Sequence, residues 1–68
     1  MKLKELLEIV SPQNELQIDD RTTRFKQLYR TYSNQAKYLT DYKQYANYKV
    51  DFIGTLPFNV IHIIIKKD

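Results

Sequence analysis

Cysteine is absent from this sequence of 68 residues, and histidine occurs once, at His62. The missing cysteines exclude disulfide bonds, and a lone histidine leaves too few ligands for a zinc site of the usual kind. Glycine also occurs once, at Gly54, whereas phosphate-binding loops need several glycines so that the backbone can approach the nucleotide. We therefore expect no metal and no other cofactor, and the lack of cysteine is typical of a reducing compartment.

Long apolar runs are missing as well. The longest apolar block, residues 60–65, is interrupted by His62 and is far too short to cross a bilayer. Near the N-terminus, Glu5 and Glu8 break up the apolar stretch that a signal peptide would need. These features predict a soluble protein that works in the cytoplasm and has no membrane partner.

Few residues offer a basis for catalysis. A nucleophilic site needs a nucleophile, a base and a group that orients the base. The one candidate base, His62, lies between Ile61 and Ile63, where we expect a structural histidine that is satisfied or partly exposed. Asp19 and Asp20 are paired carboxylates, but they lack the spacing of a calcium loop and suit a polar turn. We predict no catalytic residues and a protein that is not an enzyme.

The length allows a single domain, residues 1–68, with a core that supplies about 3–5 kcal/mol of net stability. Apolar side chains recur at helical spacing in residues 2–10, and Pro12 ends this helix. The remaining periodicities predict strands at 15–19, 24–32, 48–53 and 58–66, and a middle helix at 34–47. We therefore predict an α+β fold with one antiparallel sheet of about four strands, an N-terminal helix and a middle helix.

Details of the pattern refine this prediction. Residues 58–66 are apolar on both faces of the predicted strand, which indicates a central strand or one covered on both sides. Gly54, Pro57 and Asn59 mark the connection before this strand, and Ser33 suits the N-cap of the middle helix.

Residues 24–32 fit two different periods. At period two they form a strand that closes a hairpin with residues 15–19. At period 3.6 they continue a helix, which gives one long middle helix over residues 21–47 and fewer strands. We prefer the hairpin, because an isolated first strand would need another partner at once.

Charge and aromatic residues are concentrated in the middle of the chain. Residues 1–20 carry a net charge of −3, residues 21–49 carry +6, and all six tyrosines lie within 29–48. In the hairpin interpretation, three cations of residues 24–30 share one face of the second strand. The candidate binding face consists of Arg24, Lys26, Tyr29, Arg30, Tyr32, Lys37 and Lys43.

This basic, tyrosine-rich region has three interpretations. The cations could hold phosphates while tyrosines stack on bases, as on platforms for single-stranded nucleic acid. The tyrosines could instead be core and boundary residues beside an ordinary solvated face, and we favour this over nucleic-acid binding. Tyrosine and arginine are also enriched in protein-binding hot spots, which indicates a protein interface.

A family resemblance bears on the choice. The opening residues 2–12, Lys-Leu-Lys-Glu-Leu-Leu-Glu-Ile-Val-Ser-Pro, resemble the start of small proteins encoded by phages and mobile elements of low-GC Gram-positive bacteria. The resemblance continues loosely through residues 16–20, 28–29, 38–39, Val50 and 60–66, and its pattern consists of hydrophobic positions. It implies an α-β-β-α-β-β order. It assigns no site, and this chain departs from it in having a basic middle segment.

The resemblance also implies a class of function. Small accessory proteins of phages commonly bind and block a larger host protein, and anti-CRISPR proteins are among them. Our leading expectation is therefore a non-enzymatic accessory protein that binds a host protein, such as a defence or nucleic-acid-handling complex. Direct nucleic-acid binding is the alternative. A structural or assembly protein that self-associates through an exposed strand edge is the third.

Overall fold

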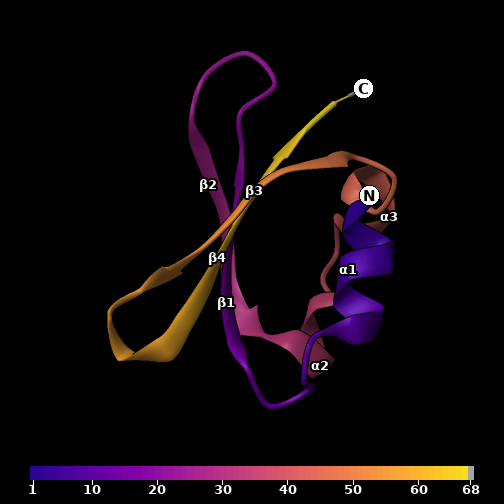
Figure 1. Cartoon of the computed structure of the whole chain (residues 1–68). Helices are drawn as coiled ribbons and strands as arrows, with labels where there is room; N and C mark the ends of the chain where they lie inside the picture. The colour runs from indigo at the N-terminus through magenta and orange to yellow at the C-terminus, as the bar shows by residue number, and fades with distance from the viewer. Residues whose placement is uncertain (68) are drawn as a thin grey trace.

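The computed structural model describes residues 1–67 and shows four strands in one mixed sheet, with short helices packed on one of its faces (Figure 1). The elements in chain order are α1 (Leu3–Ile9), β1 (Glu15–Asp20), β2 (Lys26–Tyr32), α2 (Ser33–Ala36), α3 (Tyr42–Tyr45), β3 (Lys49–Leu56), the 3₁₀ turn η1 (Pro57–Asn59) and β4 (Val60–Lys66). The predicted α+β class, N-terminal helix and first hairpin are confirmed. The alternative with a long helix over residues 21–47 is wrong, because β2 occupies part of that range. No helix within residues 1–67 is long and apolar enough to cross a membrane.

The sheet has the strand order β2-β1-β4-β3, so the expectation of a purely antiparallel sheet is wrong. The two hairpins β1–β2 and β3–β4 are antiparallel, but the strands that join them, β1 and β4, are parallel. The reason is the connection between the hairpins. The segment with α2 and α3 returns the chain to the end of the sheet where β2 began, so β3 follows the direction of β2 and β4 follows that of β1 (Figure 1).

The core lies between the helices and one face of the sheet. Leu3, Leu6 and Leu7 of α1 are buried against β1 and β4, where Ile18 and Ile63 are almost fully inaccessible. Burying a side chain of this size contributes about 1.5–3 kcal/mol. The central position predicted for the last strand is confirmed, because β4 has neighbours on both sides and buried residues on both faces.

The middle helix is broken into α2 and α3, and a turn of residues 37–41 separates them. The expected continuous helix over 34–47 is therefore wrong. Thr40 and Asp41 are both poor helix formers and lie at this break. Ser33 is not the N-cap, since it is the first residue of α2, is buried, and donates its backbone N–H to the Asn14 carbonyl at 2.8 Å.

A β-bulge changes which side chains of β2 share a face. The register shifts opposite Ile18 and Asp19, where Leu28 is the extra residue of β2, and both Leu28 and Tyr29 pack against the core. Lys26 therefore pairs on the helix-covered face, whereas Arg30 pairs with Gln17 on the opposite face. The expectation that these cations share one face is wrong, because a period-two pattern cannot show an inserted residue.

The opposite face of the sheet has no helix over it, and we call it the open face (Figure 1). The hairpin turns lie at opposite ends of the sheet: the β1–β2 turn beside the C-terminal end of β4, and the β3–β4 turn at the far end. Phe58, expected to begin the last strand, lies instead in the β3–β4 turn, while Gly54 lies inside β3.

Candidate functional site

The predicted binding residues are dispersed over the molecule. Tyr29 faces the core, and its ring meets that of Tyr45 edge to face at 6.4 Å between centroids. Burial raises the pKa of Tyr29, Tyr42 and Tyr45 above the ordinary tyrosine value. Tyr29 therefore serves the core, as the interpretation of the tyrosines as core and boundary residues predicts. Tyr38, by contrast, is 79% exposed.

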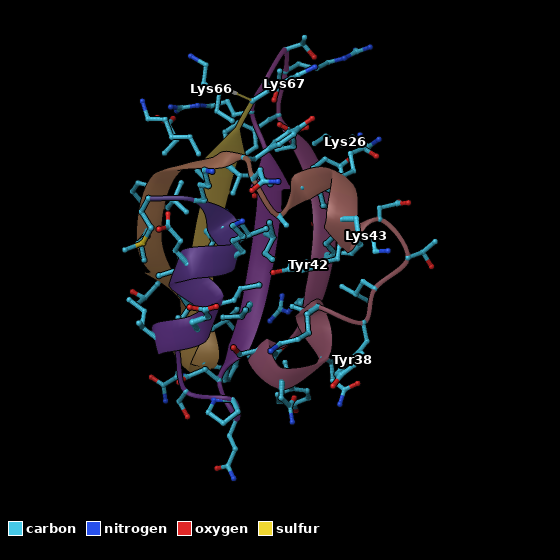
Figure 2. The ribbon with its side chains drawn as sticks, turned by 90° about the vertical axis from the view of Figure 1, so that its right-hand side faces the viewer. Lys26, Tyr38, Tyr42, Lys43, Lys66 and Lys67 are labelled. Atoms are coloured by element: carbon cyan, nitrogen blue, oxygen red, sulfur yellow. The ribbon has the colours of Figure 1, made fainter. Side chains whose placement is uncertain are left out.

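The cationic residues of the predicted binding face also lie in different parts of the molecule. Arg30 lies on the open face and makes a salt bridge to Glu15, with 3.0 Å between Arg30 Nε and Glu15 Oε2. Tyr32 is exposed beside it at the end of β2. Lys43 is exposed on the side of the molecule that carries the helices (Figure 2), and Lys37 is exposed at the C-cap of α2. The structure does not bring these four residues together with Arg24 and Lys26.

Arg24 and Lys26 do have basic neighbours, but sequence analysis missed them. Lys66 and Lys67 lie at the same end of the molecule as Lys26 (Figure 2). The backbone holds them there, because Lys67 N–H donates to Thr22 Oγ1 at 2.9 Å. We call this group, with the exposed Phe25, the basic end; its residues are Arg24, Phe25, Lys26, Lys66 and Lys67.

Two carboxylates, of Asp20 and Asp51, lie near the basic end, and Asp20 is the residue of β1 that pairs with Lys26. Asp20 Oδ1 accepts hydrogen bonds from Thr22 N–H at 2.9 Å and from Thr22 Oγ1 at 2.6 Å, which fixes the β1–β2 turn. Asp51 makes a salt bridge to Arg21. Asp20, Arg24, Phe25 and Lys26, with Thr23, line a hollow of about 540 Å³ in this turn.

The far end of the molecule has the opposite character. Residues 52–65 contain no Asp, Glu, Lys or Arg, and Phe52 and Ile53 are about half exposed. Phe58 is 93% exposed at the tip of the β3–β4 turn and has a φ of 68°, in the left-handed region that disfavours bulky residues. We call the tip of this hairpin, with Phe58, the apolar end; Phe52 and Ile53 lie nearer the middle of the sheet, where they pair with β4.

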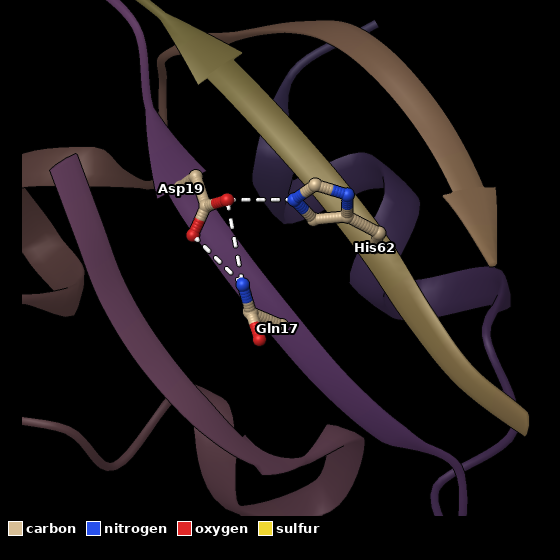
Figure 3. A network of polar contacts seen from close by, with 3 residues as sticks. All are labelled: Gln17, Asp19 and His62. Atoms are coloured by element: carbon tan, nitrogen blue, oxygen red, sulfur yellow. Dashed lines mark hydrogen bonds and ion pairs between the residues drawn. The ribbon is translucent and has the colours of Figure 1, made fainter. Parts of the chain in front are cut away.

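A polar network crosses the open face between the two ends. His62 Nε2 on β4 lies 2.6 Å from Asp19 Oδ2 on β1, and Gln17 Nε2 approaches the same carboxylate at 3.4 Å (Figure 3). Asp19 is buried in β1, within the strand predicted at 15–19, and β1 continues through Asp20, so the polar turn expected for this pair is wrong. The Phe52 ring lies beside His62, edge to face, with 5.9 Å between centroids.

The Asp19–His62 pair fixes the orientation of the imidazole. A carboxylate that orients a histidine is a component of general-base sites, which also need a nucleophile and a place for the substrate. Among residues 1–67, no group of three or more His, Asp or Glu side chains is placed to hold a metal ion. The pair links the parallel strands, and the protein's not being an enzyme remains a prediction.

Known proteins provide no further guide to these surfaces. No family model matches the chain, and neither a curated protein nor a solved structure does. Function therefore has to be argued from the basic end, the apolar end and the network between them.

Proposed function

We propose that this chain is a non-enzymatic binding module that inserts Phe58 into an apolar pocket of a partner protein. The observation that carries the proposal is the position of Phe58. A phenylalanine in the left-handed region costs about 1–3 kcal/mol, and such strain is concentrated at functional sites. Since Phe58 is 93% exposed, it gains little packing within the chain that would offset this cost.

The chemistry around Phe58 favours a protein as the partner. A nucleic acid needs cations that neutralise its phosphates, and residues 52–65 provide none. Aromatic side chains that fill a pocket dominate the energetics of protein interfaces, and the exposed ring of Phe58 is such a side chain. The β3–β4 hairpin also projects away from the helices, so a partner could reach its tip (Figure 1).

The sequence resemblance supports a bacterial host protein as the partner. Small phage and mobile-element proteins of this size commonly block or redirect a larger host protein, including host defence or nucleic-acid-handling complexes. A protruding aromatic tip on a small rigid sheet is suited to such blocking, because little conformational entropy is lost when it binds.

The test compares wild-type protein with Phe58→Gly and Tyr38→Ala, each immobilised and exposed to lysate of a low-GC Gram-positive bacterium. Glycine removes the aromatic ring and tolerates the positive φ, so this variant keeps the turn. Tyr38→Ala is the matched control, since it removes a similarly exposed aromatic ring elsewhere. We expect a partner that binds wild type and Tyr38→Ala and is lost with Phe58→Gly. Equal retention by all three proteins would contradict the proposal.

Nucleic-acid binding is a second candidate function, and the basic end favours it. Lys66 and Lys67 lie at the same end of the molecule as Lys26 (Figure 2). Lys26 lines one hollow with Arg24 and the exposed Phe25, so this end offers cations for phosphates and an aromatic ring that could stack on a base. The residues differ from the predicted set, because the parallel pairing of β1 and β4 brings the last lysines here.

Fluorescence anisotropy with labelled single-stranded DNA, duplex DNA and RNA tests this candidate. Lys66→Glu/Lys67→Glu should weaken binding and flatten its salt dependence, because fewer counterions are released. Lys37→Glu/Lys43→Glu changes the net charge equally on the helical side and should have a smaller effect. Binding that is weaker than about 100 μM at physiological salt would remove this candidate.

A further inference from the structure

The outer edge of β3 is only partly covered by its own chain. Val50 N–H donates to the Met1 carbonyl at 2.8 Å, and Leu3 N–H donates to the Tyr48 carbonyl at 2.9 Å. These bonds flank an antiparallel bridge between Lys2 and Lys49. The N-terminus therefore acts as a short additional strand at the start of β3 and stops there.

The rest of this edge, Phe52–Leu56, has none of the usual protection against pairing with another strand. Natural edges carry charged residues, prolines or bulges that block association. This segment contains no charged residue and no proline, and the bulge of β3, at Asp51, lies just before it. Phe52 is 47% exposed and Ile53 is 51% exposed, so apolar side chains flank the edge.

The other edge of the same sheet is protected. β2 carries Lys26 and Arg30, and the bulge at Leu28 interrupts the middle of the strand. The β2 edge is thus charged and is bulged in its middle, whereas the β3 edge is uncharged and regular over Phe52–Leu56. The difference indicates that the β3 edge is the one suited to pairing.

We propose that a second copy of this chain pairs antiparallel with Phe52–Leu56 and extends the sheet across a two-fold axis at Gly54. This register matches the five-residue segment onto itself, so Phe52 lies opposite Leu56 of the second copy and Ile53 lies opposite Thr55. Gly54 meets its own copy at the axis. The Phe52 ring covers Gly54, because a Cβ there would lie 2.6 Å from ring atoms, so the two Phe52 rings come together above the axis.

The two faces of β3 argue for a second copy as the occupant. Phe52 pairs with Ile64 on the open face, and Ile53 pairs with Ile63 on the helix-covered face. An added strand must therefore be uncharged and apolar on both faces, and this same segment has that character. A two-fold dimer also closes after two chains, because each copy uses its one unprotected edge.

Disulfide cross-linking tests the register. The chain has no cysteine, so Ile53→Cys and Thr55→Cys each introduce a single thiol. Paired strands place opposite Cα atoms within the range that a disulfide spans. We expect a mixture of the two variants to form the mixed disulfide dimer in preference to either same-residue dimer. Equal cross-linking in all three combinations, or none, would overturn the proposed pairing.

Sedimentation equilibrium from micromolar to millimolar concentration tests the dimer itself. Wild type should approach twice 8.2 kDa, and Ile53→Lys should remain at 8.2 kDa. Gln27→Lys adds the same charge at an exposed position on the β2 edge and should still dimerise. A wild-type monomer at all concentrations, or equal loss in both variants, would refute the proposal. Circular dichroism checks that both lysine variants are folded.

The dimer goes beyond the proposed function, and the two fail separately. Phe58→Gly should dimerise like wild type while losing the partner protein, because the turn lies beyond the paired segment. If Phe58→Gly also abolished dimerisation, the dimer contact would lie at the turn, and the proposed pairing of the β3 edges would be overturned.

Discussion

His62 of β4 and Asp19 of β1 are hydrogen-bonded across the two parallel strands, with 2.6 Å between Nε2 and Oδ2. Asp19 is 4% exposed, so its carboxylate depends on this partner and on Gln17 for much of its hydrogen bonding. Because β1 belongs to the first hairpin and β4 to the second, the pair connects the two halves of the sheet.

Replacement of Asp19 should therefore destabilise the fold. Asp19→Ala leaves the half-buried imidazole without its acceptor, and we expect the free energy of unfolding to fall by about 1–3 kcal/mol. Glu15→Ala is the control, because the Glu15–Arg30 salt bridge is solvent-exposed and should contribute below about 1 kcal/mol. Urea denaturation monitored by circular dichroism measures both. Equal losses would show that the buried pair has no special role.

Gly54 and Phe52 should show coupled effects on stability. A Cβ at Gly54 would lie 2.6 Å from the Phe52 ring, so Gly54→Ala must push the ring aside and should destabilise the wild type. In a Phe52→Ala background the same change meets no ring, and alanine in a strand is favoured over glycine by about 0.5–1 kcal/mol. In a double-mutant cycle measured by urea denaturation, the effect of Gly54→Ala on the free energy of unfolding should therefore change sign between the two backgrounds. The same sign in both backgrounds would contradict the ring's position.

Alkaline pH should destabilise the protein through its buried tyrosines. Burial first, and then the nearby charge of Asp20, raises the pKa of Tyr45, so the folded state binds its proton more tightly than the unfolded state. The contribution of Tyr45 to the free energy of unfolding is then constant below about pH 10, the ordinary pKa of tyrosine. It falls as the pH rises from there towards the raised pKa. Unfolding free energies measured from pH 7 upward test this.

The matched variants are Tyr45→Phe and Tyr38→Phe. The first removes a buried hydroxyl and should reduce the alkaline loss of stability, whereas the second changes an exposed tyrosine and should leave the pH profile as it is. A wild-type profile that stays flat above pH 10 would contradict the effect of burial.

The elements that sequence analysis predicted correctly are those whose signals lie in adjacent residues. Leu3, Leu6 and Leu7 have helical spacing, and they form the buried face of α1. Apolar residues on both faces of β4, such as Ile63 and Ile64, predicted its central position, and both are buried in the structure. In each case the pattern of burial was already present in the order of apolar residues.

The parts that were missed depend on long-range geometry. Lys66 joins Lys26 at the basic end because β1 and β4 are parallel, and that follows from the path of the chain through α2 and α3. The bulge at Leu28 changes the face of every later residue in β2, so Arg30 could not be assigned correctly by alternation. For Phe58, the flanking Pro57 and Asn59 were a signal for a turn, but the apolar run that follows favoured a strand.

Phe58 should be replaceable at a gain in stability. Its φ of 68° suits glycine, and its 93% exposed ring has little packing to lose, so Phe58→Gly should raise the free energy of unfolding by about 1 kcal/mol. Phe25→Gly is the control, since it removes another exposed ring at a residue without positive φ and should not stabilise. Thermal and urea denaturation measure both changes. A Phe58→Gly protein that is more stable and no longer binds its partner would show that the strain at this turn is kept because the exposed aromatic ring is needed for binding. A destabilised Phe58→Gly protein would show that the ring supports the fold, and the binding surface would then be sought at the basic end.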